Sequence, residues 1–353
     1  FRYATMRFRL RKMGRRREVN EQYDLPEDLD ALDERLRRVA LETVQTDARK
    51  WFSGEPRQPR DPNPWICFLG TGGSPRCMLT QSARTGGFMI NLPGFALHTD
   101  PGPGAILQAN RFNLDPTALD AVFVSHAHTD HYTEANTMIE AMCRMMSQRR
   151  GYVLAPGEIF EHNYISPFHQ GQGTTTGPYR GGPASTLSLR NNQPVALGEV
   201  TLTPHTAYHG GENYGYVLEY QGLKIGYTSD TNYVRAYRDT DGQIQEVSSA
   251  NRFGELHNVA QIVEVREDLK EIYSQVDILV ANVTLLNMWG HRHLTGYGLI
   301  DLLTGSKVRQ CYITHLDSAY FTNPGLANDL ATLITRRSGV NCKVPVEGDK
   351  YEL

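Results

Sequence analysis

The sequence has 353 residues, 40% of them hydrophobic, which is enough to bury the core of one large domain with additions, or of two domains. Its formal net charge is -3, so the whole chain has no electrostatic attraction to nucleic acid or to an anionic membrane. Five widely spaced cysteines form no C-x-x-C pair, which argues against a disulfide framework and a thiolate zinc site. No stretch reaches the roughly 20 apolar residues of a membrane span, so we expect a cytoplasmic protein without a membrane partner.

The first 64 residues are predicted to lie outside the main domain. Residues 1–17 carry eight Arg or Lys and no acid, which is typical of a solvated basic arm, a segment that binds RNA or another anionic partner, or a targeting remnant. The sequence D-L-P-E, which begins at Asp24, is a helix-start signal. The apolar residues that follow it at helical spacing predict a helix that ends near Trp51. Residues 53–64 are rich in proline and charge and predict a linker. We therefore divide the chain into 1–64 and a compact domain, 65–353.

Strand and helix signals alternate from Trp65 onward. Apolar or alternating runs predict strands at 65–70, 95–100, 121–126, 200–208, 214–220, 223–230, 276–283 and 310–316. Helical spacing predicts helices within 133–148, 258–274, 297–304 and 324–336, and a short helical turn at 115–120. The Gly-, Thr- and Pro-rich segment 171–186 predicts a loop or an arm over a site. This alternation predicts an α/β layered fold.

Three histidines and an aspartate lie at the end of the strand predicted at 121–126 and directly after it, in the order H-x-H-x-D-H. His126 and His128 are two residues apart on extended chain, so their side chains point the same way and can bind one ion. Asp130 and His131 follow in a loop and can reach a second ion. Imidazole and carboxylate ligands suit Zn²⁺ first, with Mn²⁺ or Fe as alternatives. The spacing therefore predicts two divalent metal ions.

Further ligands are expected where other apolar runs end. His209, Asp230 and His315 each follow such a run, and His205 is the main rival of His209. Each alone is more typical of a loop residue with a structural role, but three in this order favour a shared site.

These stretches resemble the metallo-β-lactamase fold, in particular its ribonuclease Z and phosphodiesterase branch, over about residues 65–345. The matching stretches are FLGTGGSPR, HTDPGPG, SHAHTDH, YHGGENYGYVLE, YTSDT, HLT and ITHLD. The resemblance implies an αββα sandwich with an added N-terminal helical segment and a binuclear metal centre. It also implies the ligand sets: His126, His128 and His209 for the first ion, Asp130, His131 and His315 for the second, and Asp230 between them.

The same resemblance implies a metal-dependent hydrolase that acts on a phosphodiester. Asp130 is the candidate to orient the attacking water or to take its proton, and His293 matches the position that contacts the scissile phosphate and can protonate the leaving oxygen. His291 is the competing choice for that role. Asp100, and similarly Thr231, are expected to hold ligand histidines by hydrogen bonds.

The sequence departs from ribonuclease Z in two places. The interval between His209 and Asp230 has room only for a hairpin, so the arm that clamps tRNA is expected to be absent. Residues 282–284 read NVT where the family has an acid that supports the catalytic histidine. These departures favour a small cyclic or linear phosphodiester ahead of nucleic acid. A lactonase or other ring-opening hydrolase, and a non-catalytic interaction protein, are the alternatives, and the oligomeric state, a homo-oligomer included, stays open.

Overall fold

The computed structural model describes residues 28–51, 54–172, 180–247, 258–287 and 292–353. Contacts divide the chain into two compact units, Phe1–Lys50 and Trp51–Leu353. The described part of the first unit is helix α1 (Leu29–Trp51), which agrees with the predicted N-terminal helix. The basic arm at 1–17 and the helix-start signal at Asp24 lie outside the described residues.

The segment predicted as a linker is bound to the second unit. The backbone N–H groups of Arg57 and Gln58 donate to Thr117 Oγ1 at 3.0 Å and to Asp115 Oδ2 at 2.8 Å. The Arg60 guanidinium donates to both oxygens of Asp120, at 2.6 and 2.7 Å. The boundary between the units therefore falls before the Pro-rich segment, whose composition does not reveal these contacts.

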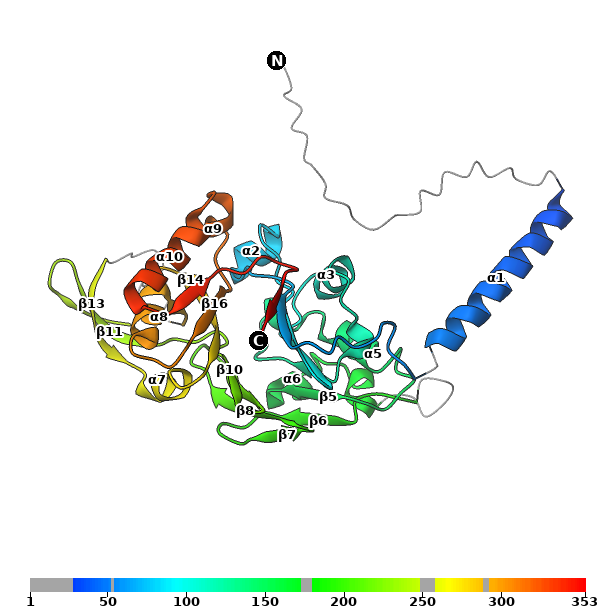
Figure 1. Ribbon diagram of the computed structural model, residues 1–353, viewed down its shortest axis with the longest axis horizontal. Coiled ribbons are helices and arrows are strands. Elements are labelled where there is room, and N and C mark those ends of the chain that lie inside the picture. The colour runs from blue at the N-terminus through cyan, green and yellow to red at the C-terminus, as the bar shows by residue number, and fades with distance from the viewer. Residues whose placement is uncertain (1–27, 52–53, 173–179, 248–257, 288–291) are drawn as a thin grey trace, which may run out of the picture. The chain divides into compact units, whose positions relative to one another are not determined.

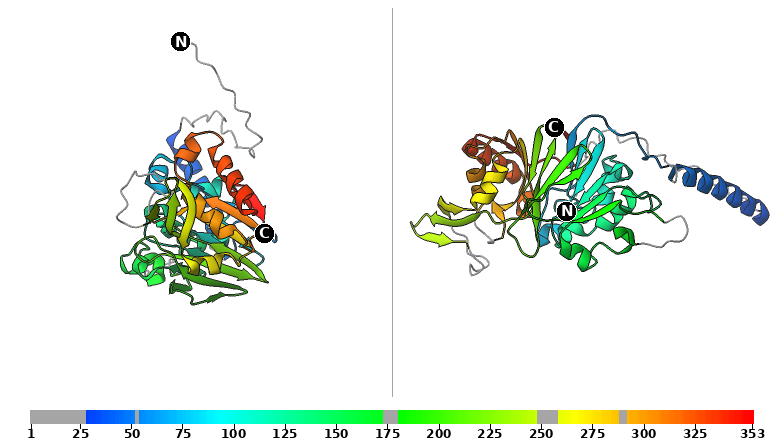
Figure 2. Two further views of the ribbon diagram at one scale, coloured as in Figure 1. Left: turned by 90° about the vertical axis from the view of Figure 1, so that its left-hand side faces the viewer. Right: turned by 90° about the horizontal axis from the view of Figure 1, so that it is seen from below.

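Two mixed β-sheets form the centre of the second unit (Figures 1 and 2). The first has the order β18-β1-β2-β3-β4-β5-β6, with bounds β1 Trp65–Phe68, β2 Phe88–Leu92, β3 Phe95–Thr99, β4 Ala121–Phe123, β5 Tyr152–Ala155, β6 Ser185–Ser188 and β18 Lys350–Glu352. The second has the order β17-β16-β14-β10-β9-β8-β7, with β15 beside β14, and bounds β7 Val195–Leu197, β8 Val200–Thr206, β9 Tyr214–Tyr220, β10 Leu223–Tyr227, β14 Ile278–Leu285, β15 Leu294–Thr295, β16 Gln310–Thr314 and β17 Asn341–Lys343.

Helices cover the outer faces of the two sheets, with α8 and α10 on one side and α3 and α5 on the other (Figure 1). The helices are α2 Ser74–Thr80, α3 Ala105–Arg111, α4 Thr129–Tyr132, α5 Ala135–Met142, α6 Gly157–Glu161, α7 Glu267–Tyr273, α8 Gly296–Leu303, α9 Ala319–Thr322 and α10 Leu326–Ser338, with a 3₁₀ turn at Pro116–Ala118 and a π-helical turn at Phe168–Gln172. This is the αββα sandwich that was predicted. None of the helices in the described residues is long and apolar enough to cross a membrane.

The core lies between the sheets and has aromatic side chains from both of them. Phe123 of β4 packs edge-on against Tyr216 of β9, with ring centroids 4.9 Å apart. Strand β1 is buried on both faces, because Ile66 faces this core while Cys67 faces the helices. Such two-sided burial explains why its sequence shows no polar alternation.

One predicted helix is partly wrong. Residues 258–274 contain strand β13 (Val259–Val265) and then α7. Val259, Ile262 and Val265 are three residues apart, which imitates helical spacing, but β13 pairs with β11 (Val234–Asp239), which also pairs with β12 (Ile244–Glu246). Strand pairing between distant segments therefore overrides the local pattern.

Candidate metal centre

The predicted ligand side chains come from segments that follow the carboxyl ends of β4, β8, β10 and β16. His126 lies three residues after β4, His209 three after β8, Asp230 three after β10 and His315 directly after β16. Strands β10, β14 and β16 are parallel neighbours, so Asp230 and His315 leave the same edge of the second sheet. The structure thus brings together all seven side chains that the sequence singled out as ligands.

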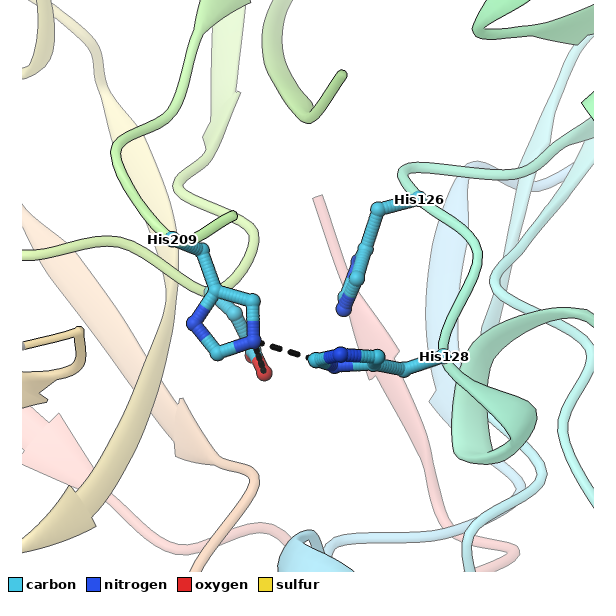
Figure 3. Close-up of side chains that lie close together, drawn as sticks. His126, His128 and His209 are labelled. Atoms are coloured by element: carbon cyan, nitrogen blue, oxygen red, sulfur yellow. Dashed lines mark hydrogen bonds and ion pairs between the residues drawn. The ribbon is translucent and has the colours of Figure 1, made fainter. Parts of the chain in front are cut away.

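The first group consists of His126, His128, His209 and Asp230, whose ligand-type atoms all lie within 4.8 Å of one another. Figure 3 shows the three imidazole rings turned toward a common point, with His209 Nε2 and His128 Nδ1 only 3.0 Å apart. His126 Nε2 is buried and has no hydrogen-bond partner among the residues that the structure describes. A buried nitrogen without a partner is costly unless something else satisfies it, so these residues fit a metal ion.

The second group consists of Asp130, His131 and His315. The short helix α4 contains both Asp130 and His131, and His315 has a left-handed backbone with φ of 61°. His315 Nε2 lies 3.2 Å from His131 Nε2 and 3.3 Å from Asp130 Oδ2. The donors are again imidazole and carboxylate, which suit Zn²⁺, Mn²⁺ or Fe.

Asp230 stands between the two groups. Its Oδ2 lies 3.2 Å from His315 Nε2, 3.6 Å from His131 Nε2 and 3.8 Å from His209 Nε2. Its other oxygen, Oδ1, accepts a hydrogen bond of 2.8 Å from Asn282 Nδ2. One carboxylate oxygen therefore faces both groups, which is the arrangement expected of a bridging ligand.

His293 lies at the same site, with its Nδ1 3.7 Å from Asp230 Oδ2 and its side chain 23% exposed. Within the described part of the chain this Nδ1 has no hydrogen-bond partner, and His293 forms a third possible ligand group with Asp230 and His315. The geometry thus brings His293 close enough for either a catalytic or a ligand role. Its rival His291 lies outside the described residues.

Hydrogen bonds hold the ligand imidazoles from behind. His131 Nδ1 donates to Asp100 Oδ2 at 2.8 Å, which confirms the role predicted for Asp100. His209 Nδ1 donates to the Arg292 carbonyl oxygen at 2.9 Å, and His126 Nδ1 lies 2.9 Å from Ser125 Oγ, a partner that sequence reasoning missed. Such contacts fix the orientation of the ring and leave the other nitrogen for a metal.

The prediction for Thr231 was wrong. Its hydroxyl oxygen accepts a hydrogen bond of 2.9 Å from the Tyr208 backbone N–H and makes none to a ligand ring. Thr231 therefore holds the backbone beside His209, because its hydroxyl bonds the backbone of Tyr208 and of Asn232.

Burial and charge divide the histidines into two classes. Burial lowers the pKa of His126, His128 and His209, so these rings are neutral at pH 7, the form that binds metals. Burial also opposes charge on His131 and His315, but the carboxylates of Asp130 and Asp230 outweigh it and raise both pKa values. The same histidines, against the effect of burial, lower the pKa of Asp130 and Asp230, so both carboxylates are ionised.

Other histidines lie outside the three ligand groups. His205 Nδ1 is 2.8 Å from Asn192 Oδ1, so the structure favours His209 over this rival. His98 is buried and its Nε2 donates to the Gly86 carbonyl oxygen at 2.8 Å. His169 pairs with Glu140 at 3.3 Å, and His257 lies outside the described residues.

Comparison with known proteins gives the same fold. Residues 96–249 match the beta-lactamase superfamily domain. The chain is 33% identical to the uncharacterized protein MJ1374 of Methanocaldococcus jannaschii over 184 residues, which is 50% of this chain and 65% of that protein. It is 24% identical to ribonuclease Z of Thermococcus kodakarensis over 309 residues, which is 80% of this chain and 93% of that enzyme. A second ribonuclease Z, from Thermococcus sibiricus, is matched over only 32% of its length.

Solved structures show the same fold at low sequence identity. YhfI of Bacillus subtilis, a metallo-beta-lactamase fold protein, superimposes with a TM-score of 0.57 at 16% identity, over 82% of this chain and all of YhfI (100%). The short form of human tRNase Z gives 0.51 at 14% identity, over 82% and 98%. A diphosphatase of the PhnP family gives 0.52 at 15% identity, over 82% and 97%. The chain therefore has the metallo-β-lactamase fold, and its sequence is similar to the beta-lactamase superfamily domain over residues 96–249 and, at low identity, to ribonuclease Z.

Proposed function

We propose that this protein is a metal-dependent hydrolase with two divalent ions, Zn²⁺ first and Mn²⁺ or Fe as alternatives, and that it cleaves phosphodiesters. The observation that carries the proposal is the position of Asp230, whose Oδ2 faces His315 at 3.2 Å and His209 at 3.8 Å. When bound by these residues, the two ions would supply an activated water as nucleophile and positive charge for the attacking and leaving oxygens of a phosphoryl transfer.

Different side chains are proposed to bind the two ions. One ion would be held by His126, His128 and His209. The other ion would be held by Asp130, His131 and His315. Asp230 would bind both ions. Asp130 is ionised and only partly buried, so its carboxylate can orient the attacking water and accept its proton.

His293 is proposed to act on the leaving group. Burial lowers its pKa to about 3, so the ring is neutral before substrate arrives. A negatively charged phosphodiester beside the ring favours its protonated form and raises this pKa. The imidazole could then hydrogen-bond the phosphoryl oxygen and give a proton to the leaving oxygen.

The proposed substrate is a small cyclic or linear phosphodiester, with nucleic acid as the variant. Strands β9 and β10 form a tight hairpin with only Gln221 and Gly222 between them, so no arm projects between His209 and Asp230. The names of the relatives, ribonuclease Z and tRNase Z, support nucleic acid, and that of the diphosphatase supports a smaller substrate. The cytoplasmic location and a homo-oligomeric state stay predictions.

Purified protein tests the proposal when metal analysis and activity are measured on one sample. We expect about two ions per chain and hydrolysis of bis-p-nitrophenyl phosphate, with metal and activity both lost in His128→Ala. His205→Ala is the matched control and should keep both, because His205 lies outside the ligand groups. Turnover of a lactone panel without phosphodiester cleavage would make the protein a ring-opening hydrolase. Absence of both metal and turnover would favour a non-catalytic interaction protein.

A further inference from the structure

We propose that Tyr227 and Asn282 are positioning residues that link the two candidate metal positions through one buried chain of hydrogen bonds. These hydrogen bonds run from Asp230 through Asn282 and Tyr227 to Asp100, whose carboxylate accepts a hydrogen bond from His131. This inference rests on the metal centre proposed above and concerns how its ligands are oriented.

Asn282 holds the bridging carboxylate in one orientation. Its amide nitrogen donates to Asp230 Oδ1 at 2.8 Å and to the Tyr227 hydroxyl at 3.1 Å. With Oδ1 engaged, the Asp230 side chain presents Oδ2 to the histidines of both groups. An acid at position 282 would offer no such donor when ionised and would place a second negative charge beside Asp230.

Tyr227 holds the carboxylate behind the second group. Its hydroxyl accepts from Asn282 and donates to Asp100 Oδ2 at 2.5 Å. Asp100 also accepts from His131 Nδ1 at 2.8 Å, and from the Ser125 backbone N–H and hydroxyl at 2.7 Å each. The amide can only donate through its nitrogen, so the bonds run from Asn282 to Asp230 and to the Tyr227 hydroxyl, which in turn donates to Asp100.

The chain of bonds is buried and crosses between the two sheets. Asp100 follows β3 of the first sheet, whereas Tyr227 ends β10 and Asn282 lies in β14 of the second. Asp100, Tyr227, Asp230 and Asn282 are only 1–3% exposed. At such depth a lost donor is not readily replaced by water, so removal of one link leaves a buried carboxylate with one hydrogen bond fewer and less firmly oriented.

Tyr227→Phe removes one hydroxyl from this chain and keeps the ring, which packs against Phe88 at 5.2 Å. Tyr216→Phe is the matched control: Tyr216 lies in the same core, and its hydroxyl bonds Thr99 Oγ1 at 2.8 Å, outside the chain from Asp100 to Asp230. Co²⁺ is the probe, because its visible absorption reports the geometry of its ligands and its affinity can be titrated against a chelator.

We expect wild type and Tyr216→Phe to bind two Co²⁺ with the same spectrum. Asn282→Asp removes a donor to the proposed ligand Asp230 and should bind Co²⁺ about 10–100-fold more weakly and with shifted bands. Tyr227→Phe removes a donor to Asp100, one bond further from the ligands, and should weaken binding and shift the bands by a smaller amount. Thermal unfolding of the metal-free proteins checks that all are folded. If Tyr227→Phe and Tyr216→Phe weaken binding equally, or neither does, the positioning role is refuted while the metal centre stands. If wild type binds no Co²⁺, both the proposed metal centre and the proposed positioning role of Tyr227 and Asn282 are refuted.

Discussion

Gly73 is predicted to be the glycine on which the position of His315 depends. A Cβ at residue 73 would lie 2.2 Å from Cγ and Nδ1 of the His315 ring. Carbon atoms in contact are normally about 3.5–4.0 Å apart, so Gly73→Ala must move the ring by more than about 1 Å. Gly73 has φ of -142°, which any residue adopts, so the substitution adds no backbone strain and its effect comes from the clash.

The clash should cost about 1–3 kcal/mol of folding free energy, as overpacking of a filled site does. Its larger effect should be on metal binding, because a ligand displaced by this distance no longer meets its ion. We expect titration against a chelator to show at least roughly 10-fold weaker binding of one of two Zn²⁺ ions, comparable to loss of a ligand's supporting contact.

Gly157→Ala is the control for this experiment. Gly157 lies at the start of α6, and its Cβ would meet nothing nearer than Glu212 Oε2 at 3.4 Å, an ordinary contact with a residue that is not among the proposed ligands. Wild-type affinity for both ions in Gly73→Ala would refute the reasoning, since His315 would then either yield to the methyl group at no cost or not be a ligand.

Three further predictions concern other parts of the chain. His293→Ala should keep both ions but lose roughly 10²- to 10⁴-fold in turnover of a phosphodiester with a poor leaving group, and less with a p-nitrophenolate leaving group; loss of metal would make His293 a ligand. Burial lowers the pKa of His98 from 6.5 to about 4, so between these values the unfolded chain binds a proton that the folded chain does not. The free energy of unfolding should therefore fall by up to about 3 kcal/mol as the pH drops through this window, and denaturant titrations of His98→Gln should show a smaller fall. Removal of residues 1–17 should weaken RNA binding and flatten its salt dependence if this arm contacts phosphates; an unchanged slope would leave it a solvated arm.

Local sequence was sufficient to predict which side chains gather at the site. The ligand-type residues follow apolar runs, and side chains that follow parallel strands of one sheet leave it at the same edge. The pattern H-x-H-x-D-H and the single residues His209, Asp230 and His315 therefore predicted the seven side chains that the structure brings together. The alternation of strand and helix signals is a local property of the chain and predicted an α/β layered fold, whereas the αββα order of the layers was implied by the resemblance to the metallo-β-lactamase fold.

Tertiary structure alone decided how these side chains are oriented. Tyr227 lies 127 residues from Asp100 in the chain, and Asn282 lies 52 from Asp230, so no local pattern marks them as partners. The same limit explains the helix wrongly predicted at the position of β13, whose pairing with β11 is a contact between distant segments. Hydrophobic spacing is set by residues a few positions apart, whereas the direction of a buried hydrogen bond depends on which strands the fold places face to face.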